Sequence, residues 1–390
     1  MTNKMTYKTK KPSILLIREE ASFFIISLTI LLFSYGADEL LSVAITPGTI
    51  NLFICSILGI WLLGTILWAA FNVVRHAEAL ALKLGEPLGT IILTLSVVGI
   101  EVALISAVML TGEAAPTMAR DTMMAILMIV LGGLTGASIL IGGYIHGEQE
   151  YSLPGARTFL GVLLPLAVFA LILPKFTLST EFATFSSYQA AFFAFTTFAL
   201  YVIFLRIQTN RHKSYFEQPK KERTADHEAA NERAHYHGKL HSTYYHIAFL
   251  ILTLVPIVLL SKRIAKIIDF GIVEVGAPVA LGGIIIAFIV LIPESMAALS
   301  SARANQLQRS INLLLGSALS TIGLTLPAVL AVSLVTEQSL ILGLDMAPMV
   351  LLLLTLVVCI MTFNSARTNI MQGAVHLVLF LAYLLLILNP

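Results

Sequence analysis

Charged side chains are scarce in this sequence. Only 12% of its 390 residues are Asp, Glu, Lys or Arg, about half of the roughly 25% that is usual in a soluble domain. So little charge could not cover a water-exposed surface, which excludes an ordinary water-soluble protein. The formal net charge of +2 also comes without the basic patch that a nucleic-acid-binding protein needs, so we expect no nucleic-acid partner.

Cysteine pairs and enzyme motifs are missing as well. Cys55 and Cys359 both lie inside apolar runs, and their spacing suits neither a metal site nor a disulfide framework. The sequence has no phosphate-binding Gly-x-x-x-x-Gly-Lys-Ser/Thr motif, no His-Glu-x-x-His motif and no nucleophile motif. We therefore expect no enzyme, no cofactor and no direct use of ATP.

Apolar residues are abundant, at 57% of the chain. They gather in runs of about twenty residues, the length with which a helix crosses the hydrocarbon core of a bilayer. Pro165 and Pro256 interrupt two of these runs. The eleven predicted spans are 14–33, 49–73, 88–110, 121–145, 158–173, 190–205, 244–260, 275–292, 310–335, 346–361 and 372–388. The sequence thus predicts an all-α polytopic membrane protein with the lipid bilayer as its surroundings.

The distribution of basic residues predicts the orientation in the membrane. The basic N-terminus before the first run looks like a secretory signal, but Asp38 and Glu39 follow the run instead of a small-residue cleavage site, so we expect an uncleaved helix. With the N-terminus in the cytoplasm and the C-terminus outside, most basic residues lie inside, as the positive-inside rule requires. The loops outside then carry Arg120, Lys175, Lys262, Arg263 and Lys266, the last three in one loop that opposes this topology.

The chain divides into two halves around its only long hydrophilic segment. Residues 1–48 hold the basic N-terminus and first helix, 49–207 a first five-helix repeat, 208–242 a cytoplasmic linker and 243–390 a second five-helix repeat. Because each repeat has an odd number of helices, equivalent helices cross the membrane in opposite directions. This is the inverted-repeat architecture of secondary transporters.

The two halves can be overlaid on a shared motif. Gly89-Thr90-Ile91-Ile92 matches Gly282-Gly283-Ile284-Ile285, and a glutamate follows each leading glycine after twelve residues, namely Glu101 and Glu294. Further along, Gly132-x-x-x-Gly136 matches Gly316-x-x-x-Ser320. The common order of the matches indicates a repeat that places both glutamates at one depth.

A glutamate in the middle of a membrane helix indicates a function. It costs roughly 2.5–3.5 kcal/mol on insertion scales for charged residues. Alone, Glu101 could be a protonated residue that joins two helices by a hydrogen bond. Two glutamates at matched repeat positions favour an ion site, because the repeats of a transporter meet at the bilayer midplane.

Other polar groups could complete this site. Thr90 and Thr94 share a helix face with Glu101. The ninth span adds the polar side chains of Asn312, Ser317 and Ser320. Helix breaks at Gly89, Gly282 and Gly283 could leave backbone carbonyls available as further ligands. Close helix packing is the alternative explanation for the small residues. A site made of oxygen atoms suits Ca²⁺, Na⁺ or K⁺. Protons compete for the same carboxylates, so the sequence predicts an exchange of cation for H⁺.

The linker between the halves is rich in histidine and acidic residues. His235, His237 and His241, with the other candidates His227, Glu228 and Glu232, could form a cytoplasmic cation or pH sensor. A solvated charged linker is the simpler interpretation. A protease is excluded, because Asn231 stands where a zinc-protease motif has its second histidine.

Several motifs together resemble a known family, the cation/proton exchangers of the calcium/cation antiporter superfamily, and among them the bacterial ChaA-type proteins. The motifs are His76-Ala77-Glu78-Ala79-Leu80-Ala81, Gly85-Glu86-Pro87, Leu281-Gly282-Gly283-Ile284, Pro293-Glu294-Ser295 and Asn305-Gln306-Leu307-Gln308-Arg309-Ser310. The resemblance implies eleven helices, inverted repeats, a place in the bacterial inner membrane, and Glu101 and Glu294 as ligands shared by cation and proton. ChaA-type proteins are associated with the exchange of sodium, potassium and calcium for protons.

One departure from the family leaves the transported cation open. Calcium/proton exchangers of this superfamily typically carry Gly-Asn-x-x-Glu in each repeat, whereas this chain has Val97-Val98-Gly99-Ile100-Glu101 and Val290-Leu291-Ile292-Pro293-Glu294. The missing asparagines leave Ca²⁺, Na⁺ and K⁺ as candidates. A cation channel or passive pore, which could also use paired acids, is the alternative function, and a homo-oligomer stays open.

Overall fold

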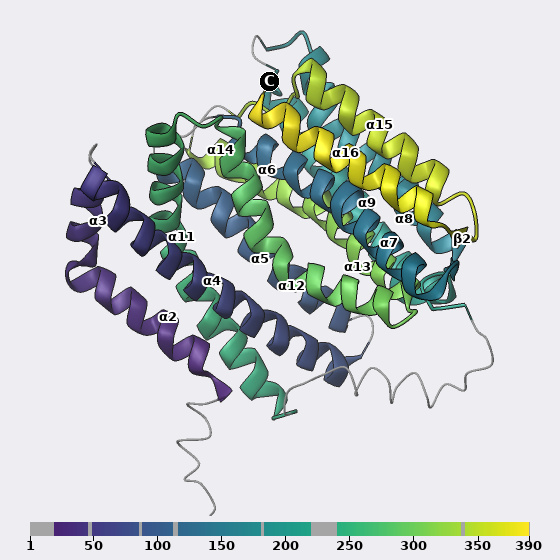
Figure 1. Ribbon diagram of the computed structural model, residues 1–390, viewed down its shortest axis with the longest axis horizontal. Coiled ribbons are helices and arrows are strands. Elements are labelled where there is room, and N and C mark those ends of the chain that lie inside the picture. The colour runs from purple at the N-terminus through teal and green to yellow at the C-terminus, as the bar shows by residue number, and fades with distance from the viewer. Residues whose placement is uncertain are drawn as a thin grey trace, which may run out of the picture.

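The protein is a bundle of long helices packed side by side (Figure 1). The computed structural model describes residues 19–45, 49–85, 88–111, 116–180, 183–219, 240–336 and 340–389. The helices of the first half and the linker region are α2 (Ala21–Leu32), η1 (Phe33–Ala37), α3 (Asp38–Ala44), α4 (Thr49–Leu84), α5 (Leu88–Thr111), α6 (Met118–Leu127), η2 (Met128–Leu134), α7 (Thr135–His146), α8 (Leu153–Ala167), η3 (Val168–Ile172), η4 (Leu173–Phe176), α9 (Ser187–Arg206), η5 (Ile207–Arg211) and η6 (Lys213–Tyr215). Those of the second half are α11 (Thr243–Val275), α12 (Ala280–Arg303), α13 (Leu307–Ser320), η7 (Thr321–Thr325), α14 (Leu326–Thr336), α15 (Met346–Thr362) and α16 (Ile370–Leu388).

The predicted all-α membrane fold is confirmed. In the described residues, eight helices are long and apolar enough to cross a membrane, and three shorter apolar helices accompany them at Ala21–Gly36, Thr94–Ser106 and Met346–Thr362. These eleven segments coincide with the eleven predicted spans. The described part has a single strand pair, in which the two-residue strands β1 (Gln149–Glu150) and β2 (Arg367–Thr368) run antiparallel.

The seventh and eighth helices differ from their predicted limits. The spans 244–260 and 275–292 are in fact α11, which runs on to Val275, and α12, which begins only at Ala280 and ends at Arg303. Lys262, Arg263 and Lys266 therefore lie inside a helix, and the prediction that they form an outside loop is wrong. The hydropathy pattern predicts too early an end for the seventh helix, because three basic residues close together are typical of a loop. In the structure the Arg263 guanidinium donates to both carboxylate oxygens of Asp38, at 2.8 Å and 2.6 Å.

The proline-containing helices also continue through their prolines. Pro165 lies inside α8, Pro256 inside α11 and Pro293 inside α12. A membrane helix tolerates proline because neighbouring helices and local adjustments satisfy the freed carbonyl. The continuation of α12 past Pro293 places Glu294 within the helix.

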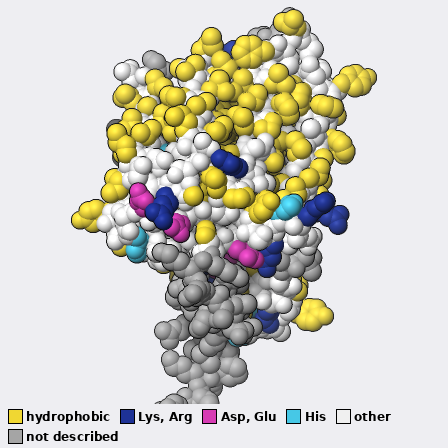
Figure 2. All heavy atoms as spheres, turned by 90° about the vertical axis from the view of Figure 1, so that its right-hand side faces the viewer, with side chains coloured by type: hydrophobic (Ala, Val, Ile, Leu, Met, Phe, Trp, Pro, Cys, Tyr) yellow, Lys and Arg dark blue, Asp and Glu magenta, His cyan; other side chains and the backbone are white. Residues whose placement is uncertain are grey.

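The outer faces of the bundle are apolar. Large exposed hydrophobic side chains follow α4 with Phe53, Ile60 and Trp61, and α16 with Val378 and Leu385. Figure 2 shows hydrophobic side chains over the upper part of one face, with basic, acidic and histidine side chains gathered below. We call this lower end, where α4 ends at Leu84 and α11 begins at Thr243, the linker end. An apolar belt of this extent is the surface that a bilayer requires.

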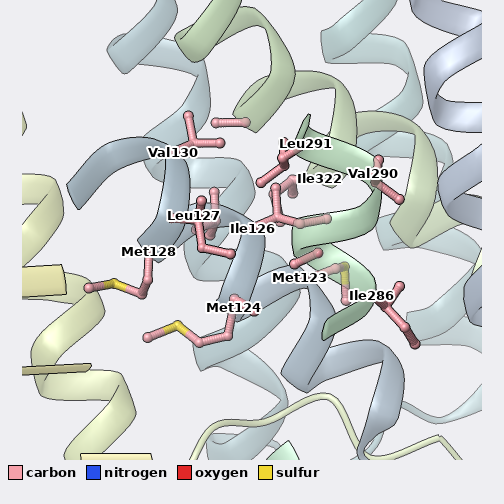
Figure 3. Close-up of a cluster of buried hydrophobic side chains, with 14 of the residues drawn as sticks. Met123, Met124, Ile126, Leu127, Met128, Val130, Ile286, Val290, Leu291 and Ile322 are labelled. Atoms are coloured by element: carbon pink, nitrogen blue, oxygen red, sulfur yellow. The ribbon is translucent and has the colours of Figure 1, made fainter. Parts of the chain in front are cut away.

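The interior is packed around α6, η2 and α12. Figure 3 shows Met123, Leu127 and Val130 converging with Val290 and Leu291, all of them buried. The backbones approach closely at the start of α12, because a Cβ added to Gly283 would lie 2.8 Å from the Asp121 carbonyl carbon. Tight contact of this kind fixes the helix that carries Glu294 against the first half of the chain.

Two helices contain π-helical segments in their middle. η2 interrupts the fourth membrane helix and η7 the ninth, which are equivalent in the predicted repeats. A π segment leaves backbone groups without their usual partners, and such segments often mark functional sites. In η2 the Leu131 carbonyl accepts a 2.6 Å hydrogen bond from Nδ1 of buried His376, whose Nε2 lies 3.0 Å from the Thr362 hydroxyl.

Glycines bring α7 and α16 into backbone contact. A Cβ on Gly136 would lie 2.8 Å from the carbonyl oxygen of Gly373, and a Cβ on Gly373 would lie 2.9 Å from that of Gly136. Helices in lipid associate through small residues because these allow close van der Waals packing. The predicted Gly132-x-x-x-Gly136 motif therefore packs against the last helix.

We predict that Gly136→Ala destabilises the protein by about 1–3 kcal/mol, the usual cost of overpacking. The added methyl group would force α7 and α16 apart. The control is Gly161→Ala in α8, where a Cβ meets nothing within 4 Å. Thermal unfolding in detergent checks this, and equal transition midpoints for the two variants would contradict the packing role.

Candidate cation-binding site

Glu101 lies deep inside the bundle. It comes from α5, its side chain is buried, and two hydroxyl groups donate to it. Thr321 donates to Oε2 at 3.0 Å and Thr325 to Oε1 at 2.9 Å. Each carboxylate oxygen therefore has its own donor from η7, in the opposite half of the chain.

Glu294 is the partner of Glu101. It comes from α12, is partly buried, and accepts a short hydrogen bond from the Ser317 hydroxyl. The two carboxyl groups are close enough for their charges to interact. The fold thus brings together the two glutamates that the repeat overlay had paired.

A single helix provides the hydroxyl groups for both glutamates. Ser317, Thr321 and Thr325 are four residues apart and lie along the end of α13 and through η7. Residues at such spacing share one face of a helix. In the overlay of Gly132 on Gly316, the fourth membrane helix has Gly133, Ala137 and Ile141 at the equivalent positions. The site is therefore built asymmetrically from a symmetric pair of acids.

Tyr201 closes the site from α9. Thr94 and Glu294 both lie within interaction range of its hydroxyl. Its ring lies against η7, where a Cβ on Gly323 would approach the Tyr201 Cβ to 2.8 Å. Thr94 thus joins the site through Tyr201.

The glycines singled out in the sequence are not brought to the carboxylates. Gly282 and Gly283 are in the first turn of α12, roughly 16–18 Å from Glu294 at 1.5 Å of rise per residue. They allow close packing on α6 instead, where a Cβ on Gly282 would lie 2.9 Å from Met118. Packing, the alternative explanation, accounts for them.

Gly89 and Thr90 occupy the corresponding first turn of α5. The helix rise places them roughly 16–18 Å from Glu101. The surroundings of the Thr90 side chain lie outside the described residues.

The predicted role of Asn312 as a ligand is not supported. Its Oδ1 accepts a 2.7 Å hydrogen bond from Gln308 and its Nδ2 donates to the Phe216 carbonyl at 2.6 Å. The second of these hydrogen bonds attaches Phe216, in the segment after α9, to α13. Ser320 is also committed elsewhere, because its hydroxyl donates to the Ser317 carbonyl at 3.0 Å.

Of the candidate histidines in the linker, one belongs to the described structure. His227, Glu228, Glu232, His235 and His237 lie outside the described residues. His241 lies at the linker end, with its Nε2 2.9 Å from Glu19.

The donor set consists of oxygen atoms. Within the described residues, no group of three or more His, Cys, Asp and Glu side chains is placed to hold a metal ion. Two carboxylates with serine and threonine hydroxyls instead match the ligands that hard cations prefer.

Sequence reasoning did not assign Thr321, Thr325 or Tyr201 to the site. The four-residue spacing of Ser317, Thr321 and Thr325 was a usable signal. Tyr201 had none, because it lies in the other half of the chain and reaches the site only through the tertiary fold.

Comparison with known families decides the class of the protein. The family of sodium/calcium exchanger proteins matches residues 55–210 and 245–389. The chain belongs to the sodium/calcium exchanger family. This confirms the resemblance seen in the sequence motifs, and family members are transporters.

Individual relatives cover nearly the whole exchanger chain. The sodium-potassium/proton antiporter ChaA of Escherichia coli (strain K12) is 40% identical over 372 residues, which are 95% of this chain and 96% of the relative. Among solved structures, YfkE has a TM-score of 0.67 at 16% identity, covering 96% of this chain and 99% of YfkE. The H⁺/Ca²⁺ exchanger CAX has a TM-score of 0.66 at 15% identity, covering 95% of this chain and 88% of CAX. The two structures show a shared fold.

We predict that Asn312→Ala leaves cation exchange intact but lowers stability by about 1–3 kcal/mol, the cost of an unsatisfied buried hydrogen-bonding group. The Phe216 carbonyl would lose its donor. Exchange rates and thermal unfolding of the same preparation check this. A large loss of exchange without a loss of stability would restore Asn312 as a ligand.

Proposed function

We propose that this exchanger is a secondary active antiporter that exports a cation in exchange for protons, with Glu101 and Glu294 as ligands shared by both. The observation that supports this most is the pair of neighbouring carboxyl groups inside the bundle, held by hydroxyls of one helix. Alternating access would present this pair to each side of the membrane in turn.

Charge balance explains why exchange is obligatory in this proposal. Two ionised glutamates near each other in an apolar interior are unfavourable, because burial opposes charge and like charges repel. A bound cation or bound protons remove this penalty, and both use the same oxygen atoms. A protein whose site is empty and doubly ionised therefore converts least readily between the states that open to the two sides of the membrane.

The candidate cations are Ca²⁺, Na⁺ and K⁺. Hard oxygen ligands bind all three, and two carboxylates match the charge of one Ca²⁺ ion. The missing Gly-Asn pairs remove the amide ligands of calcium/proton exchangers, and the 40% identical relative is a sodium-potassium/proton antiporter. Both observations support the transport of monovalent cations in addition to Ca²⁺.

We place the protein in the bacterial cytoplasmic membrane with the linker end in the cytoplasm. Arg75 and Lys83 of α4 and Arg303 of α12 are at this end, as the positive-inside rule favours. The first described helix begins at the linker end and α16 ends at the opposite end (Figure 1). The C-terminus then lies outside.

We predict that Glu101→Gln and Glu294→Gln each abolish exchange, because an amide takes up no proton and has no negative charge to balance the cation. Everted vesicles with an acidic interior provide the assay: addition of Ca²⁺, Na⁺ or K⁺ should collapse the pH gradient across the wild-type membrane. Glu274→Gln at the exposed end of α11 is the control. Near-normal exchange in either glutamate variant, or a cation current without proton movement, would refute the proposal.

We also predict that Thr325→Val raises the half-saturating cation concentration about tenfold or more, since a hydrogen bond to a charged group contributes roughly 1.5–3 kcal/mol. The valine keeps the shape but removes a donor to Glu101. Thr336→Val is the matched control, because the Thr336 hydroxyl donates to the Val332 carbonyl of its own helix at 2.8 Å. Equal half-saturation in the two variants would show that Thr325 does not tune the site.

A further inference from the structure

A second buried cluster of ionisable groups lies at the linker end, where α2, α4 and α11 meet. Glu20, the residue before α2, accepts hydrogen bonds at its Oε2 from Arg75 at 2.8 Å and Asn72 at 3.2 Å, and at its Oε1 from Tyr245 at 2.6 Å. Glu20 and His76 are both about 1% exposed. None of these residues takes part in the proposed transport site.

Two histidines continue the cluster from helix to helix. Nε2 of His76 in α4 lies 3.0 Å from Glu20 Oε2, and its Nδ1 lies 2.9 Å from Nδ1 of His246 in α11. Nε2 of His246 accepts a hydrogen bond from the backbone N–H of His241 at 3.1 Å. One continuous chain of hydrogen bonds therefore links all three helices.

This chain fixes where each proton sits. Because Nε2 of His246 is an acceptor, a neutral His246 carries its proton on Nδ1, which donates to Nδ1 of His76. His76 then carries its proton on Nε2 and donates it to Glu20. The contacts of His246 with His241 and His76, and of His76 with Glu20, are all satisfied when both imidazoles are neutral and Glu20 is ionised. Arg75, whose Nη2 lies 3.5 Å from Nε2 of His76, then donates to Glu20 at 2.8 Å instead.

An additional proton has no acceptor in this arrangement. On His246 it would occupy Nε2 and face the His241 N–H, and on His76 it would occupy Nδ1 and face the Nδ1–H of His246. Either proton places two N–H groups against each other, which replaces an attraction by a repulsion. Proton uptake therefore opposes the His76–His246 hydrogen bond that joins α4 to α11.

The surrounding charges do not compensate for such a proton. Arg75 and Lys83 on α4 carry positive charge, and His241, which precedes α11, can become positive; all three act on His246. Glu19 accepts from the His241 side chain at 2.9 Å. Burial raises the pKa of Glu20, but hydrogen bonds from His76 and Tyr245 and the charge of Arg75 lower it below its usual range. Glu20 thus stays ionised with both oxygens occupied.

The helices in this cluster also touch the helices of the cation site. α4 and α11 both pack against α5, which carries Glu101, and α4 packs against α12, which carries Glu294. Loss of the contact between α4 and α11 would act directly on the packing around both carboxylates. The cluster is therefore placed to couple protonation at the linker end to the transport site.

We propose that the His76–His246 pair is a second proton-binding site, separate from the two glutamates, and that a proton bound there loosens α11 from α4. Its ligand is H⁺ from the side that the linker end faces. The site itself follows from the hydrogen bonds, whereas its effect on exchange rests on the proposed function.

The test uses protein whose transport site cannot titrate. In a Glu101→Gln/Glu294→Gln background with Cys55 and Cys359 replaced by Ala, spin labels are attached at Ile251→Cys on α11 and Tyr144→Cys on α7. These side chains are exposed, and their helices lie on opposite sides of the bundle (Figure 1). Pulsed electron resonance measures the distance between the labels at pH 8 and pH 5 in lipid nanodiscs.

We expect one distance population at pH 8 and a shifted or broadened one at pH 5. His246→Asn and His76→Gln, which do not titrate, should each abolish this pH response. His146→Gln should keep it, because His146 is exposed at the same end and contacts the Arg303 carbonyl. Identical distances at both pH values in the histidine-containing protein, or an unchanged pH response in both cluster variants, would overturn the proposal.

Nitrogen-15 NMR of the histidine rings provides a second readout that does not depend on helix movement. At pH 8, His246 should show the Nδ1–H tautomer and His76 the Nε2–H tautomer, each identified by the loss of its signals in the corresponding variant. Imidazolium signals from either residue at pH 8 would refute the proton assignment. Neither measurement requires transport, so their failure is distinct from a failure of the exchange proposal.

Discussion

The structure depends on the burial of two carboxyl groups where water cannot solvate their charges. An uncompensated charge in a membrane interior is costly, so Glu101 and Glu294 need donors, and Ser317, Thr321 and Thr325 provide them. The hydroxyls must reach acids from both halves of the chain, which brings α5, α12 and the ninth membrane helix together. The π-helical segment η7 holds two of the donors and lies at this meeting point.

The symmetry of the repeats does not extend to the ligands. The two glutamates come from equivalent helices, yet all three hydroxyl donors come from one helix of the second half. The fourth membrane helix, its counterpart, uses η2 differently: His376 donates to the Leu131 carbonyl and holds the segment against α16. The ninth membrane helix thus supplies the hydroxyl donors, whereas its counterpart in the first half is held against α16.

Much of this could be predicted from the sequence, for physical reasons that differ between residues. The limits of α5 were predicted to within a residue, since its apolar run is bounded by glycine, glutamate and proline. The proximity of Glu101 and Glu294 could be anticipated because carboxylates are conspicuous in apolar runs and these two occupy matched positions in the overlay. Thr325 and Tyr201 were not predicted, because hydroxyl side chains are common in membrane helices and only the tertiary fold brings these two close to the glutamates. Asn312 was misread because its partner, the Phe216 carbonyl, is 96 residues away in the chain.

The central claim is that cation and proton compete for one pair of carboxylates. Proton release from purified protein tests it most directly. Addition of Ca²⁺, Na⁺ or K⁺ to the protein in weakly buffered detergent solution should release protons, and the Glu101→Gln/Glu294→Gln protein should release none. Saturable cation binding without proton release across the pH range of exchange, or equal release from the double variant, would contradict the account.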